Sequence, residues 1–239
     1  MKIGIKTFDY DEDLKKLVDI IDFIEIMAVE TSDYSKFKDF NIPFVIHAQH
    51  QRFEVNNADK TRLERNKRSL NFAIKIADML NAKKIVIHPG LLTDENCSSE
   101  NAVSFFNQFN DKRIIIENMP FPENKKQLCT DVDETKKFLN KTKKGFCLDF
   151  NHAVIGFLDS KDKYLQRIKD FLKLKPVHYH IGGQKLNGES HLNFKDCDIN
   201  IQEIIDLIPE NAEVTLETTV NMNDLKEDIE FMRKIIRKK

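Results

Sequence analysis

The sequence is poor in several residue types that mark particular protein classes. Its 239 residues include no tryptophan, seven glycines, six prolines and four cysteines. The cysteines are far apart and form no C-x-x-C pair, which argues against a disulfide framework or a zinc ribbon and favours a reducing, cytoplasmic compartment. No apolar run approaches the roughly 20 residues that span a bilayer, and the first residues lead into a strand-like segment rather than a signal peptide. We therefore expect a soluble cytoplasmic protein.

An excess of charge of one sign is also absent. The chain carries 38 lysines and arginines against 39 aspartates and glutamates, a formal net charge of -1. Composition therefore gives no reason to expect tight non-specific nucleic-acid binding, although a local basic patch could provide it. A hydrophobic share of 41% with 32% charged residues is typical of a globular protein with a buried core.

Strand-like and helix-like segments alternate regularly along the chain. Short runs of β-branched and aromatic residues predict strands at 2–6, 23–28, 44–47, 84–88, 113–117, 145–149, 177–180 and 213–217. Amphipathic stretches separate them, the clearest at 58–81. About 30 residues per strand–helix unit predicts an α/β fold, a (β/α)8 TIM barrel forming a single domain over residues 1–239. The rival is a doubly wound open sheet, but no glycine-rich phosphate loop follows any strand.

Ionisable residues end six consecutive predicted strands. They are His47, His88, Glu117, Asp149, His180 and Glu217. In a barrel, these strand ends meet at the face that carries the active site. Because burying an unpartnered charge costs several kcal/mol, such a ring needs a common partner. A metal cluster is the simplest one.

Three more residues fit the same chemistry, namely His152, Glu189 and His191. Together the nine provide nitrogen and oxygen ligands suited to Zn2+, Mn2+ or Fe2+. Nine exceed the needs of one ion, so two or three ions are expected. Glu189 and His191 lie in a loop and could equally be solvated. His50 is either a substrate contact or a loop residue, and His178, on the strand face of His180, fits a barrel-interior residue.

The ordered series resembles the endonuclease IV-like branch of the xylose isomerase-like TIM barrels. The resemblance covers nearly the whole chain and rests on His47-Ala-Gln-His50, Ile87-His88-Pro-Gly90, Glu117-Asn118, Cys147-Leu-Asp149-Phe-Asn-His152-Ala, His180, Glu189-Ser-His191 and Leu216-Glu217-Thr218. Five positions depart from that family's pattern. Lys6 stands where it usually has His, His50 where it has Tyr, Glu189 where it has Asp, and Gly182-Gly183 where it has Asn-Asp.

The resemblance implies a trinuclear centre, usually of zinc, that hydrolyses phosphodiesters. It places the first ion on His47, His88 and Glu117, the second on Glu117, Asp149, His180 and Glu217, and the third on His152, Glu189 and His191. Glu117, as the bridging ligand, and Glu217 would be the catalytic carboxylates. The implied partner is DNA containing abasic sites, with substrate contacts assigned to His50, Arg52 and Lys185 on a chain expected to be monomeric.

Two other functions stay open. A sugar or sugar-phosphate isomerase or epimerase on this barrel would use Glu117, Asp149, His180 and Glu217 around one ion, with the two glutamates moving protons. Sugar-phosphate members usually carry an arginine soon after the seventh-strand histidine, and none lies between His180 and Ile201. That absence favours hydrolysis. A degenerate barrel serving as a binding module is the third possibility, and the intact ligand series argues against it.

Overall fold

The computed structural model describes residues 1–121, 126–218 and 222–237, in which eight parallel strands close into a barrel. The predicted (β/α)8 barrel is confirmed, and the open sheet is excluded because the last barrel strand pairs with the first. The strands run around the barrel in chain order as β1 (Lys2–Thr7), β2 (Phe23–Ala28), β3 (Phe44–Ala48), β4 (Ile85–Ile87), β6 (Ile114–Glu117), β8 (Gly145–Asp149), β9 (His178–Ile181) and β12 (Glu213–Leu216).

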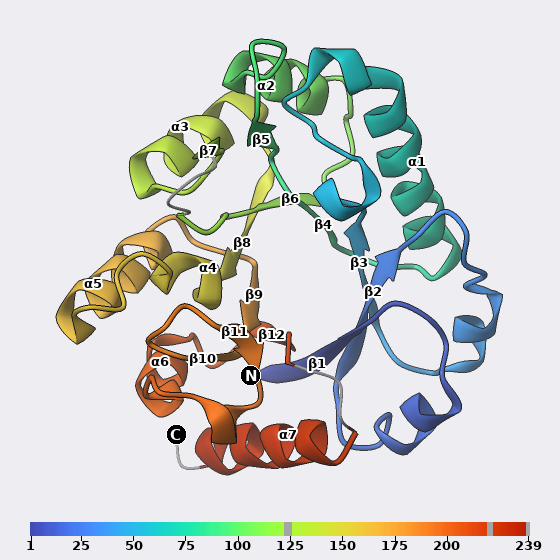
Figure 1. Ribbon diagram of the computed structural model, residues 1–239. Coiled ribbons are helices and arrows are strands. Elements are labelled where there is room, and N and C mark those ends of the chain that lie inside the picture. Colours follow the sequence, from blue (N-terminus) through green and yellow to red (C-terminus); the bar gives the residue numbers. More distant parts are fainter. Residues whose placement is uncertain (122–125, 219–221, 238–239) are drawn as a thin grey trace.

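Helices surround most of this barrel (Figure 1). They are α1 (Leu63–Met79), α2 (Ser99–Asn107), α3 (Val132–Thr142), α4 (Phe150–Val154), α5 (Lys161–Leu172), α6 (Ile201–Leu207) and α7 (Met222–Ile236). The predicted helix at 58–81 begins later than expected, because Asp59 first caps a short 3-10 turn, η4 (Lys60–Arg62). Among the described residues, no helix is long and apolar enough to cross a membrane.

The first two strand connections lack the α-helix that a regular barrel unit has. In residues 8–22 and 29–43 the structure has only the 3-10 helices η1 (Glu12–Lys16) and η2 (Ser35–Asp39). Each still covers the barrel, since Leu14 and Phe37 are buried. Short apolar patches thus replace a full amphipathic helix on this side.

Two small antiparallel ribbons lie outside the barrel sheet. One pairs β5 (Leu91–Leu92) with β7 (Lys126–Gln127), and the other pairs β10 (Gly183–Gln184) with β11 (Ser190–Leu192). A further 3-10 helix, η3 (Gln51–Phe53), follows β3, and η5 (Phe194–Asp196) follows β11. The β10–β11 ribbon carries His191, and η3 carries Arg52, so these additions place predicted site residues beside the barrel mouth.

The barrel interior has an apolar layer beneath its ionisable residues. Phe23, Val45, Val86, Ile115 and Cys147 form a buried cluster of their own, separate from the larger core between strands and helices. A Cβ on Gly4 would lie 2.2 Å from the Phe23 ring, so the missing side chain of β1 makes room for the aromatic ring. Val45, Val86 and Ile115 precede His47, His88 and Glu117 by two positions, so the members of each pair lie on the same face of the strand.

Candidate metal centre

The six strand-end residues converge at one end of the barrel, with small shifts from their predicted places. Glu117 and Asp149 are the last residues of β6 and β8, as predicted. The strands β3 and β9 extend one residue beyond His47 and His180, whereas β4 and β12 end one residue before His88 and Glu217. Glu117, Asp149, His47 and His180 are fully or almost fully buried.

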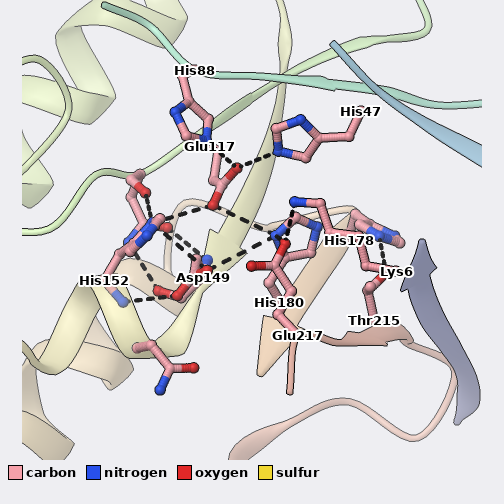
Figure 2. Close-up of polar contacts among 12 residues, drawn as sticks. Lys6, His47, His88, Glu117, Asp149, His152, His178, His180, Thr215 and Glu217 are labelled. Atoms are coloured by element: carbon pink, nitrogen blue, oxygen red, sulfur yellow. Dashed lines mark hydrogen bonds and ion pairs between the residues drawn. The ribbon is translucent and has the colours of Figure 1, made fainter. Parts of the chain in front are cut away.

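Glu117 lies at the centre of this group (Figure 2). Its Oε2 atom is 3.2 Å from Nε2 of both His47 and His88. Its Oε1 atom is 3.2 Å from Nδ1 of His152 and 3.5 Å from Nδ1 of His180. One carboxylate therefore faces imidazoles from four different parts of the chain.

The Nδ1 contacts of His47 and His88 indicate which nitrogen of each ring carries the proton. Nδ1 of His47 lies 2.8 Å from the Ala48 carbonyl oxygen, and Nδ1 of His88 lies 3.2 Å from Oε1 of Gln51. A carbonyl oxygen only accepts, so each Nδ1 donates a proton, and in the neutral ring Nε2 is left with a lone pair. Two lone pairs thus face a carboxylate oxygen, an arrangement that a cation completes.

A second ligand group joins Glu117 to Asp149, His180 and Glu217. Oδ1 of Asp149 accepts from the His152 amide at 2.7 Å and caps α4. Its Oδ2 atom is 3.9 Å from Nδ1 of His180 and has no hydrogen-bond partner among the described residues. Nδ1 of His180 is also 2.9 Å from Oε1 of Glu217. The ends of β6, β8, β9 and β12 thus each bring one side chain of this group close to the others.

The three residues predicted for the third ion are not all together. His152 lies 3.6 Å from Oδ2 of Asp149, and the ring centroids of His152 and His191 are 5.9 Å apart. Nδ1 of His191 is 3.4 Å from Oε2 of Glu217. Glu189 is exposed instead and pairs with Lys185 at 2.9 Å across the β10–β11 turn.

The predicted substrate-contact residues lie at the rim. The ring of His50 stacks on His88 with centroids 4.8 Å apart. Arg52 is exposed in η3, and Lys185 is engaged by Glu189. His178 is fully buried inside the barrel, as its place on the strand face of His180 predicts, and its Nε2 is 3.0 Å from Oε2 of Glu25.

Sequence reasoning missed Glu25 as a member of this cluster and gave Lys6 no partner. Glu25 is fully buried in the middle of β2, where its Oε2 also lies 3.0 Å from Nε2 of His180. Nζ of Lys6 lies 2.6 Å from Oε1 of Glu217 and 3.8 Å from Oε1 of Glu25. The available signal was a lone charge in the apolar segment FIEIMA, although it lies in the middle of the strand and not at its end.

The electrostatics of the cluster follow from burial opposed by close partners. Burial raises the pKa of the Glu117 carboxyl, but the nearby His88 and His180 imidazoles and the hydrogen bonds from His152 and His180 hold it well below its usual value. Burial raises the pKa of Asp149, and the nearby Glu117 and Glu217 raise it further. Burial lowers the pKa of His88 to about 4, whereas for His152 burial is outweighed by Asp149 and Glu117, which raise it to about 9.

These residues fit divalent metal ions. Among the described residues, the sets His47–His88–Glu117 and Glu117–Asp149–His180 each bring one ligand atom per residue within 4.8 Å of the others. Oδ2 of Asp149 and Nδ1 of His180 are buried without a well-formed hydrogen bond to any described residue. Imidazole nitrogen and carboxylate oxygen are ligands that Zn2+, Mn2+ and Fe2+ accept. An ion would satisfy atoms that the protein leaves unpaired.

Comparison with solved structures agrees with the barrel fold. Endonuclease IV from Thermus thermophilus superimposes with a TM-score of 0.77 at 15% identity, covering 100% of both chains. A D-tagatose 3-epimerase-like protein gives 0.76 at 19% identity, covering 99% of this chain and 97% of that one. The TTHB071 protein, also from Thermus thermophilus and soaked with ZnCl2, gives 0.70 at 15% identity, covering 100% and 99%.

At these identities the structural similarities establish the fold, which enzymes of different chemistry share. No curated protein sequence matches the chain. The family model described as xylose isomerase-like TIM barrel, however, matches residues 4–235. The chain therefore belongs to the xylose isomerase-like TIM barrel family.

Proposed function

We propose that the protein is a metal-dependent phosphodiester hydrolase whose centre holds at least two divalent ions, with zinc favoured. The observation that carries this proposal is the position of Glu117, whose two oxygens face two separate ligand groups. A carboxylate so placed can bridge two ions, and paired ions are suited to displacement at phosphorus. The fold similarity to a protein soaked with ZnCl2 is consistent with zinc.

The two ligand groups have distinct members. His47, His88 and Glu117 would hold one ion, and Glu117, Asp149, His180 and Glu217 would hold the other. Divalent ions held there would act as Lewis acids on a phosphoryl group and lower the pKa of a water molecule. The chain itself orients the ligands, through the Ala48 carbonyl behind His47 and the α4 cap made by Asp149.

A third ion would use residues on the outer side of the cluster. His152 and His191 already lie near each other, whereas Glu189 would have to leave Lys185 and turn inward with its exposed ribbon. We therefore propose two ions from the geometry and a third from the family resemblance.

We propose DNA containing abasic sites as the substrate. This rests on the ordered motifs that resemble the endonuclease IV-like branch, and it is consistent with the fold shared with the Thermus endonuclease IV. His50, Arg52 and Lys185 lie at the rim, where two of them could meet a phosphate backbone and His50 could contact an exposed base or sugar.

A second candidate is a divalent-metal-dependent sugar isomerase or epimerase. Its support is that Glu117 and Glu217 both approach His180, as two carboxylates flanking one ion would. Against it stands Lys6. Burial raises the pKa of Glu217, but Lys6 and His180 hold it well below its usual value. Nζ of Lys6 lies 2.6 Å from Oε1 of Glu217, and a carboxylate engaged by an ammonium group is a poor base, so hydrolysis is favoured.

Metal stoichiometry separates the two candidates. Elemental analysis of protein purified without chelator is expected to give two or three ions per chain, and one ion would contradict the hydrolase centre. Glu189→Gln tests the third position, because loss of one ion from a count of three would make Glu189 a ligand. Glu117→Gln is expected to lose most of the metal.

Cleavage of an oligonucleotide with one abasic site then tests the substrate. Metal-loaded protein at low salt is expected to cut it, and Glu117→Gln to lose at least about 100-fold in rate, the order of effect of removing a group that stabilises the transition state. Glu213→Gln is the matched control, because Glu213 begins the same strand that leads to Glu217 but pairs with Lys2 and Lys84 at the other end. Intact DNA together with epimerisation of a ketose would favour the second candidate.

A further inference from the structure

Glu25 is a buried carboxylate that has no place in the predicted ligand set. It lies in the middle of β2, between Ile24 and Ile26, and has no exposed surface. It is paired in register with Lys6 of β1 and Val45 of β3, so it faces the barrel interior one layer below the strand ends. A buried charge in this position needs several donors to be stable.

Three donors meet one oxygen of this carboxylate. Oε2 of Glu25 is 3.0 Å from Nε2 of His178, 3.0 Å from Nε2 of His180 and 2.7 Å from Oγ1 of Thr215. An ionised carboxylate accepts only, so both imidazoles donate from Nε2. Once Nε2 of His180 carries a proton, the lone pair of a neutral ring is at Nδ1.

That lone pair is directed at the proposed metal centre. Nδ1 of His180 lies 2.9 Å from Oε1 of Glu217, 3.5 Å from Oε1 of Glu117 and 3.9 Å from Oδ2 of Asp149. Figure 2 shows the His180 ring between Glu217 and the Glu117–Asp149 side of the cluster. The two nitrogens of one ring thus connect a buried carboxylate to the ligand group.

We propose that Glu25 is a positioning residue, which holds the Nε2-protonated form of His180 and so directs its Nδ1 lone pair to the divalent ion shared with Glu117, Asp149 and Glu217. This inference rests on the proposed metal centre. Carboxylates behind metal-binding imidazoles act in this way generally, by fixing the tautomer and the ring orientation.

Glu25, His178 and His180 also lie close enough together to hold an ion of their own. The hydrogen bonds account for this triad without one, because Oε2 already receives three donors, including the Thr215 hydroxyl that an ion would not require. The proposal therefore assigns Glu25 to orientation rather than to ligation.

The first test needs no variant. In 15N-histidine-labelled, zinc-loaded protein, long-range 1H–15N spectra are expected to show His180 with a proton on Nε2 and none on Nδ1. A proton on Nδ1 with a bare Nε2 would overturn the proposal. In zinc-free protein the Nε2 proton must persist, and its absence would overturn the proposal without reference to any metal.

The second test measures affinity. Glu25→Gln keeps the shape but removes the charge, and its zinc dissociation constant, from competition with a chelator, is expected to rise about 10- to 100-fold. Thr215→Val is the matched control, because it removes a donor to the same oxygen and leaves His180 bound; a change below about threefold is expected. Equal affinity of Glu25→Gln and wild type, or an equal loss in Thr215→Val, would contradict a positioning role.

The metal centre and the role of Glu25 are tested separately. Failure of the wild type to take up zinc, seen by elemental analysis, would remove the metal centre and this inference with it. Zinc uptake with the wrong tautomer of His180 would overturn the role of Glu25 alone and leave the proposed hydrolase standing. If Glu25→Gln does not fold, the spectra of the wild type still decide.

Discussion

At the residue scale, three imidazoles of the cluster are each oriented by the acceptor behind the ring. The Ala48 carbonyl lies behind His47, the Gln51 amide behind His88 and the Glu25 carboxylate behind His180. The same principle explains why histidines so close to one carboxylate remain ordered, because each ring has one nitrogen committed to a fixed partner.

Lys6 differs from these residues because it competes for a ligand. Its ammonium group contacts Oε1 of Glu217 at 2.6 Å and so neutralises part of the charge that would attract an ion. Lys6→Gln is therefore expected to lower the zinc dissociation constant, on the order of tenfold for charges a few ångströms apart in a partly buried site. Chelator competition measures this, and Lys2→Gln, on the same strand at the opposite end, should leave the constant unchanged. Weaker binding by Lys6→Gln would show that Lys6 supports the centre instead.

His178 makes stability depend on pH. Burial lowers its pKa to about 4, despite the opposing effect of Glu25, from an ordinary value of 6.5. Since the unfolded chain binds the proton more readily, the stabilisation is present above pH 6.5 and is lost as pH falls toward 4. Between pH 7.5 and 4.5 this one group accounts for about 2 kcal/mol of the fall in the free energy of unfolding.

The corresponding variant is His178→Gln. In urea unfolding of zinc-free protein, its loss of stability between these two pH values is expected to be about 2 kcal/mol smaller than that of the wild type. Equal losses would mean that His178 is protonated in the folded protein or accessible to water, contrary to its complete burial.

At the element scale, the start of α4 joins secondary structure to chemistry. Asp149 ends β8, caps α4 through Oδ1 and turns Oδ2 toward the cluster. The sequence indicates the strand end, because an apolar run stops at an acidic residue. It does not indicate that a five-residue helix follows at once, since so short a helix has no periodicity to read.

Asp149→Asn separates the capping of α4 from the binding of metal. The amide oxygen can still cap α4, and burial and the neighbouring Glu117 and Glu217 raise the pKa of Asp149, so its charge is unfavourable without metal. Zinc-free Asp149→Asn is therefore expected to be at least as stable as the wild type. Its zinc affinity should fall at least about tenfold. Asp149→Ala, which also loses the cap, should be destabilised by about 1 kcal/mol. A zinc-free Asn variant as unstable as the Ala variant would refute this separation.

At the scale of the whole molecule, sequence patterns predict the closed barrel well. They predict poorly which side chains pair with each other across its interior. Eight apolar runs and their polar ends were sufficient to place His47, His88, Glu117, Asp149, His180 and Glu217 at one face, because parallel strands share one direction. Glu25 and His178 could not be paired in the same way. They are 153 positions apart in sequence, and only the curvature and stagger of the closed barrel bring their side chains together.

The 3-10 helices that replace α-helices after β1 and β2 could not be predicted for a different reason. Residues 8–22 and 29–43 each contain apolar residues at helical spacing, but the structure uses only one 3-10 turn in each to cover the barrel. Side chains such as Leu14 and Phe37 already cover the neighbouring strands, so a longer helix would bury little additional apolar surface. Packing across the whole molecule, rather than local propensity, decides these segments.

We expect the stability of the whole barrel to depend on bound metal. Four buried or nearly buried carboxylates, Glu25, Glu117, Asp149 and Glu217, lie at one end of the barrel, and Lys6 is the one lysine that contacts any of them among the described residues. An ion bound only by the folded chain stabilises it by about 4 kcal/mol when present at about 1,000 times its dissociation constant. Removing the metal with a chelator is therefore expected to lower the melting temperature by on the order of 10 °C in calorimetry.

Glu117→Gln should show little chelator-dependent shift in melting temperature, because it lacks the carboxylate that faces both ligand groups. A wild-type melting temperature that a chelator leaves unchanged would mean that the ring of ionisable residues is held by its own ion pairs and not by metal.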